Sequence, residues 1–233
     1  AYSNTTGAQN VAMGVQSLYT NSTGNYNNAF GFQALYYSTG SNNTAFGHNA
    51  LVNNTTASNN TAVGYQAAYA NTTGGAITAV GYGALASNTT SSNSTAVGYA
   101  ALNQSTAANN TAIGYQAAYL TTTGSSVMAI GYQAGRQNTT GDNNIFVGVQ
   151  CGYYNSTGSQ NVGVGDGALS GNAAVAGNFS SNVAMGINTL AKLQTGAYNV
   201  ALGNQALFSN TTASYNTAVG YQAGYGNSSG YNN

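Results

Sequence analysis

Residues 60–67 read Asn-Thr-Ala-Val-Gly-Tyr-Gln-Ala, and close variants of this phrase recur along nearly all of the 233-residue chain. Most copies lie 17 residues apart, as the glycines Gly64 and Gly81 do. A fixed short period is typical of a solenoid, in which each coil contacts mainly its neighbours. The repeat glycine occurs thirteen times, at Gly14, Gly31, Gly47, Gly64, Gly81, Gly98, Gly114, Gly131, Gly148, Gly165, Gly186, Gly203 and Gly220.

The phrase opens with a short strand, because Thr61 and Val63 belong to residue types that favour pleated backbone. Alternation along a strand sends Val63 to one face and Ala62 to the other. The residue before the repeat glycine is apolar in all thirteen copies, so we expect this row to fill the coil interior and the alanine row to pack against other copies of the chain. The expected core is Val63, Val80, Val97, Ile113, Ile130, Val147, Val164, Leu202 and Val219.

The stretch after the glycine is open to two interpretations. Tyr65, Ala68 and Tyr69 have the spacing of one helix face, yet five residues are equally compatible with extended chain. We therefore predict an all-β fold, a parallel β-solenoid (β-roll or β-helix) of about 13 coils of 17 residues, with one short helical turn per coil as an open alternative. One elongated repeat domain spanning residues 1–233 is expected, with an irregular insertion near residues 166–182, where two repeat glycines are 21 residues apart.

A second row consists of asparagines that stand four residues before the repeat glycine. Stacked in successive coils, their amides can bond to one another along the axis, as in cross-β asparagine ladders. We expect an inward or corner ladder formed by Asn10, Asn27, Asn43, Asn60, Asn110, Asn144, Asn161, Asn182, Asn199 and Asn216.

A third row lies in the turn that reads Asn-Thr-Thr-Gly or a close relative. Sixteen Asn-X-Ser/Thr sequons occur in the chain, and nine of them share this turn position. They predict a row of N-linked sugars along one edge, with simple turn chemistry as the alternative. These candidates are Asn4, Asn21, Asn54, Asn71, Asn88, Asn138, Asn155, Asn210 and Asn227.

Composition argues against several classes of function. Only four side chains carry a fixed charge and the formal net charge is zero, so no basic patch is available for nucleic acid, and self-repulsion between copies is weak. The only histidine and the only cysteine, Cys151, lie in unrelated copies of the repeat. We predict no catalytic, cofactor-binding or metal-binding residues, and a small buried role for Cys151. No long apolar run is present, so membrane insertion is not expected.

The repeated Asn-Thr-Ala-Val-Gly-Tyr-Gln-Ala string resembles the head repeats of trimeric autotransporter adhesins and related repeats of phage tail fibres. The resemblance covers about half of each unit from Val11 to Ala223. It implies a parallel solenoid that packs against copies of itself. The adhesin-head period is shorter than 17 residues, and no neck motif or membrane anchor is recognised here.

Together these features predict a non-enzymatic structural subunit of an extracellular fibre or filament, at a cell or virion surface, whose partners are copies of itself and whose turns carry glycans. The alternative is an adhesin or phage-fibre binding module that recognises glycan or a host surface. Such a module would use the tyrosine row one residue after the glycine and the threonine row three residues before it. These rows are Tyr65, Tyr82, Tyr99, Tyr115, Tyr132 and Tyr221, and Thr44, Thr61, Thr78, Thr95, Thr111 and Thr217.

Overall fold

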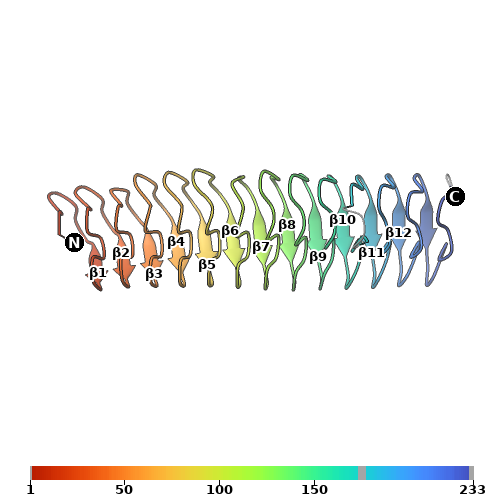
Figure 1. Ribbon diagram of the computed structural model, residues 1–233, viewed down its shortest axis with the longest axis horizontal. Coiled ribbons are helices and arrows are strands. Elements are labelled where there is room, and N and C mark those ends of the chain that lie inside the picture. The colour runs from red at the N-terminus through yellow and green to blue at the C-terminus, as the bar shows by residue number, and fades with distance from the viewer. Residues whose placement is uncertain (1, 173–176, 231–233) are drawn as a thin grey trace. The chain divides into compact units, whose positions relative to one another are not determined.

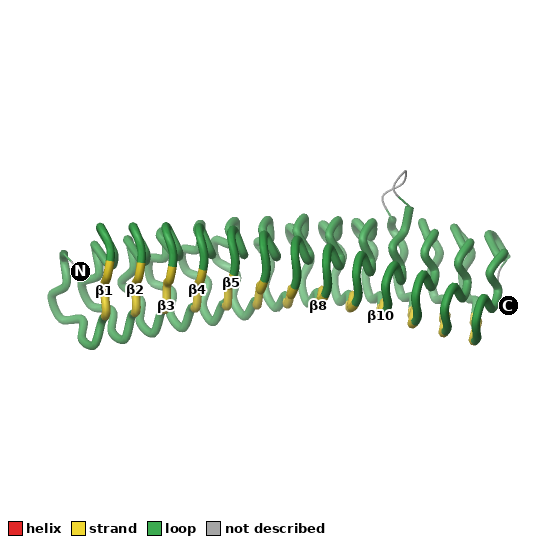
Figure 2. Tube along the Cα trace, turned by 90° about the horizontal axis from the view of Figure 1, so that it is seen from below, coloured by secondary structure: helices red, strands yellow, loops and turns green. Residues whose placement is uncertain are grey.

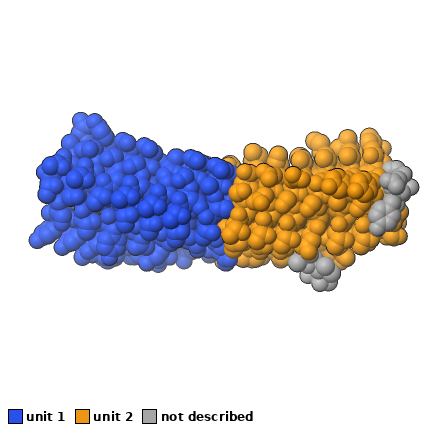
Figure 3. Space-filling model, turned by 90° about the horizontal axis from the view of Figure 1, so that it is seen from above, with its two compact units in different colours: residues 1–110 blue, residues 111–233 orange. Residues whose placement is uncertain are grey.

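The computed structural model describes residues 2–172 and 177–230 and divides into two compact units, residues 1–110 and residues 111–233 (Figure 3). In the described part of the chain, every regular element is a strand of three residues. Residues 166–172 and 177–182 of the expected insertion are described, whereas residues 173–176 lie outside the described part. Unit 1 holds β1 (Val11–Met13), β2 (Asn28–Phe30), β3 (Thr44–Phe46), β4 (Thr61–Val63), β5 (Thr78–Val80) and β6 (Thr95–Val97). Unit 2 holds β7 (Thr111–Ile113), β8 (Met128–Ile130), β9 (Ile145–Val147), β10 (Val162–Val164), β11 (Val183–Met185), β12 (Val200–Leu202) and β13 (Thr217–Val219).

Within each unit, consecutive strands pair in parallel and in register (Figure 1). In unit 1, β4 pairs with β5 so that Ala62 faces Ala79 and Val63 faces Val80. Unit 2 repeats this arrangement, and Figure 2 shows its strands as yellow segments that follow one another from coil to coil. Each unit is therefore a parallel β-solenoid, which confirms the fold predicted from the period.

The stretch after the repeat glycine is neither helix nor strand. It forms consecutive turns, in which Ala67 N–H donates to the Gly64 carbonyl at 3.4 Å and Asn71 N–H donates to the Ala68 carbonyl at 3.2 Å. Gln66 and Ala68 have φ of 53° and 50°, values in the left-handed region that a right-handed helix does not use. The alternative of a helical turn is therefore wrong. These residues also bond between coils, because Gln66 N–H donates to the carbonyl of the preceding coil and Ala68 N–H to that of the following coil.

The core lies on the face opposite to the one that we expected. The alanine row is buried in the single chain, with Ala62 and Ala79 at 0% exposure, whereas Val63 and Val80 point outward and are half-buried. Leucine or alanine four residues after the glycine fills the interior beside the alanines, as Leu85 does at 0% exposure. The whole expected core row is thus on the outer surface, at intermediate or high exposure: Val63, Val80, Val97, Ile113, Ile130, Val147, Val164, Leu202 and Val219.

The width of the coil is the physical reason for this arrangement. A side chain at Gly163, in the alanine row, would place its Cβ 2.6 Å from Cys151 Sγ, so the interior has no room for a valine at every coil. Phe146 is the exception and is fully buried. Its ring occupies space that glycines leave free in two coils, since a Cβ at Gly135 would lie 2.9 Å from the ring and one at Gly152 would overlap it.

Candidate functional site

The expected asparagine ladder is buried and bonded along the axis of each unit. In unit 1, Oδ1 of Asn27 accepts from the backbone N–H of Asn43 at 2.9 Å, and Oδ1 of Asn43 accepts from that of Asn60 at 3.1 Å. In unit 2 the side chains also bond directly, with Nδ2 of Asn199 donating to Oδ1 of Asn182 at 3.0 Å. The row therefore satisfies backbone donors that the short strands leave unpaired.

The turn asparagines form a second buried ladder, which contradicts their assignment as glycan acceptors. Nδ2 of Asn71 donates to Oδ1 of Asn54 at 2.9 Å and to the Gly74 carbonyl at 3.0 Å. An N-linked sugar replaces a hydrogen on this nitrogen and needs open space around it, so the folded coil excludes it. Seven of the nine candidates are at 0% exposure, namely Asn21, Asn54, Asn71, Asn88, Asn138, Asn155 and Asn210. The remaining two, Asn4 and Asn227, are less buried.

The outer face of the strands carries two rows. The first consists largely of threonine and the second is the apolar row before the repeat glycine. Several apolar side chains are strongly exposed, among them Met13 at 60%, Phe46 at 56% and Val219 at 68%. Residues 1–110 contain no Lys, Arg, Asp or Glu, so the outer face of unit 1 is apolar and uncharged apart from His48.

Aromatic side chains follow directly after the glycine and stack along the axis. In unit 1, Phe32, His48, Tyr65, Tyr82 and Tyr99 form a continuous series, with centroid distances of 4.9, 5.3, 5.1 and 5.2 Å between neighbours. In unit 2, Tyr115 and Tyr132 stack at 5.3 Å. Each internal ring therefore has both faces against its neighbours. The rings are about half exposed.

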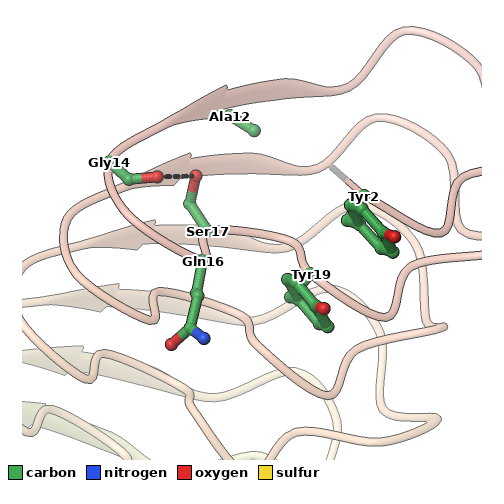
Figure 4. A pocket seen from close by; sticks show the side chains of 6 residues that line it. All are labelled: Tyr2, Ala12, Gly14, Gln16, Ser17 and Tyr19. Carbon is green, nitrogen blue, oxygen red and sulfur yellow. Dashed lines mark hydrogen bonds between the residues drawn. The ribbon is translucent and has the colours of Figure 1, made fainter.

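A shallow hollow of about 340 Å³ lies at the first coil of unit 1 (Figure 4). It is lined by Tyr2, Ala12, Gly14, Gln16, Ser17 and Tyr19. Ser17 Oγ donates to the Gly14 carbonyl at 3.0 Å, and the rings of Tyr2 and Tyr19 stack at 5.0 Å. The hollow thus has a polar but uncharged lining, in which the hydroxyl and one pair of rings are already engaged with the protein.

Titratable groups are few and dispersed. Cys151 is buried as expected, and desolvation raises the pKa of its thiol to about 12. The Arg136 guanidinium lies 5.5 Å from the centre of the Tyr119 ring and 5.8 Å from that of Tyr153, a cation–π arrangement that the sequence did not suggest. Among the described residues, no group of three or more His, Cys, Asp or Glu side chains could hold a metal ion.

Comparison with known proteins leaves this chain without a recognised relative, since no family model matches it and no similar curated protein is found. Within residues 2–172 and 177–230, the structure contains no helix long and apolar enough to cross a membrane.

Proposed function

We propose that this chain is a non-enzymatic structural subunit of an extracellular fibre or filament, at a cell or virion surface. The observation that carries the proposal is the set of continuous axial ladders in each unit. Backbone hydrogen bonds, buried asparagines and stacked rings all run from coil to coil, so stability is distributed along the axis. The resemblance of the repeat phrase to adhesin heads and phage fibres supports the location.

Self-association is part of this proposal, but its surface differs from the one that we expected. The alanines are enclosed within the coil and offer nothing to a neighbouring copy. The outer apolar row of unit 1, which includes Met13, Phe30, Phe46, Val63 and Val80, is available instead. An exposed apolar surface that opposes no charge with charge is typical of a protein–protein interface.

The alternative, an adhesin that grips glycan through its tyrosines, has less support from the geometry. Sugars bind aromatic residues by packing against a ring face. In the series from Phe32 to Tyr99, the internal ring faces already contact neighbouring rings. The edges and hydroxyl groups remain as contacts, which favours a structural ladder.

The test compares two triple variants by analytical ultracentrifugation and negative-stain microscopy. Val63→Lys, Val80→Lys and Val97→Lys together place three charges on the outer apolar row. The matched control places the same three charges on exposed turn threonines, through Thr56→Lys, Thr73→Lys and Thr90→Lys.

We expect the wild type and the turn variant to form elongated assemblies and the apolar-row variant to remain monomeric, with all three folded by circular dichroism. A wild type that stays monomeric at high concentration would contradict the proposal. Equal loss of assembly in both variants would show that added charge, rather than the apolar row, controls association.

A further inference from the structure

The sequons of this chain fall into two structurally different classes. Those in the turn have buried acceptor nitrogens, as described above. Another class starts five residues before the repeat glycine. Three of its members lie wholly within unit 1, at Asn42, Asn59 and Asn93.

In this second class the acceptor is on the outside of the coil. Asn42, Asn59 and Asn93 are exposed, and their φ values of 59°, 63° and 60° place them in the left-handed region that asparagine tolerates. Their backbone N–H groups bond to the preceding coil. Among the described residues, their side-chain amides make no hydrogen bond to the protein. The acceptor nitrogen is therefore free to react.

The threonine that completes each sequon is on the same side. Chain alternation places Asn42 and Thr44 outward and Asn43 inward, where Asn43 is at 0% exposure and its Nδ2 donates to the Ala57 carbonyl at 2.9 Å. The same alternation holds for Asn59 and Thr61 around a buried Asn60. An enzyme that reads both Asn and Thr can therefore approach them from one direction.

The turn class has the opposite geometry. Asn71 points inward while its sequon threonine, Thr73, is exposed, so acceptor and recognition residue face different environments. Two sequons with the same pattern of residues thus differ in the folded protein only by the direction of the acceptor.

We propose that Asn42, Asn59 and Asn93 are acceptor sites for N-linked sugar in the folded chain and that the buried turn asparagines are not. In the reaction, Nδ2 forms a bond to C1 of a nucleotide-activated sugar while the bond from C1 to the phosphate oxygen breaks. The nucleoside diphosphate leaves with the bonding electrons, and Nδ2 loses one proton to a base of the transferase. The proposal does not rest on self-association.

The experiment treats the folded, unglycosylated chain with a soluble sequon-specific N-glycosyltransferase and UDP-glucose, and maps hexose by mass spectrometry. Synthetic peptides covering both classes of sequon serve as controls for the sequence preference of the enzyme. Thr44→Val removes one sequon and retains a β-branched residue, which stands at this position naturally in β10, β11 and β12.

We expect hexose on Asn42, Asn59 and Asn93 and at least tenfold lower occupancy on Asn54, Asn71 and Asn88, although peptides of both classes are modified. Thr44→Val should remove hexose from Asn42 alone. Equal occupancy of the two classes in the folded chain would overturn the proposal, as would unmodified Asn42, Asn59 and Asn93 when their peptides react.

Discussion

At the scale of single residues, the repeat glycine tolerates the least change. Gly81 has φ of 132°, a conformation that side chains rarely adopt. A Cβ at this position would also lie 2.7 Å from the carbonyl carbon of Gly98 and 3.3 Å from its Cα. Two independent costs, backbone strain and overlap with the next coil, therefore coincide at one position.

Gly220 allows these two costs to be separated. Its φ of 126° is similar, but no described atom lies within 4 Å of a Cβ built there. We expect Gly220→Ala to lower the free energy of unfolding by about 1–2 kcal/mol through strain alone, and Gly81→Ala to lower it by about 3 kcal/mol or more. Urea denaturation followed by circular dichroism measures both. Similar losses for the two variants would show that close packing between coils is not the larger cost.

A second residue-scale prediction concerns a gap in the turn ladder. Oδ1 of Asn88 is buried without a hydrogen-bond partner among the described residues, because the next coil has Ser105 at the equivalent position. Asparagine in this row donates to the preceding Oδ1, as Asn88 itself donates to Asn71 at 2.9 Å. We expect Ser105→Asn to supply the missing donor and to stabilise the protein by about 1 kcal/mol.

The control for this variant is Asn88→Ala, which removes two donated hydrogen bonds, one to Asn71 and one to the Ser91 carbonyl. It should destabilise the protein by about 1–3 kcal/mol. If Ser105→Asn leaves the unfolding midpoint unchanged or lowers it, the ladder does not provide the stabilisation that we assign to it.

At the scale of the element, a three-residue strand has one inner position, and the sequence alone did not identify it. The pattern Thr-Ala-Val is apolar at two positions, and the rule that apolar residues lie inside does not require every one of them to be buried. The volume of the coil decides the matter. Compensating pairs such as Phe146 with Gly152, and Gly163 with Cys151, carried this information, since a large residue is matched by a missing side chain nearby.

The inverted face leads to opposite expectations for neighbouring residues. Ala79 is at 0% exposure inside the coil, so Ala79→Leu should overpack the interior and lower the free energy of unfolding by about 1–3 kcal/mol. Val80→Lys places a charge on the outer face and should change it by less than about 1 kcal/mol. Thermal unfolding of dilute, monomeric samples measures both. The reverse order of the two effects would restore the valine row to the interior.

At the scale of the whole chain, the period was sufficient to predict parallel coils and their register. A repeat of fixed length can stack its strands only in parallel, with equivalent residues above one another, as β4 and β5 do. The sites were harder to predict, because a sequon or a tyrosine row specifies chemistry but not direction. Asn59 and Asn71 begin equivalent motifs, yet one side chain is exposed and the other enclosed.

Charge distribution gives the last prediction, which rests on the proposed self-association. Four fixed charges occur in the chain and none in residues 1–110, so contacts between copies depend on apolar burial and are not screened by salt. We expect sodium chloride to leave the sedimentation of assemblies nearly unchanged and sodium sulfate to promote assembly, because sulfate strengthens apolar burial. Dissociation by moderate sodium chloride would instead require an electrostatic interface, for which unit 1 has no fixed charges.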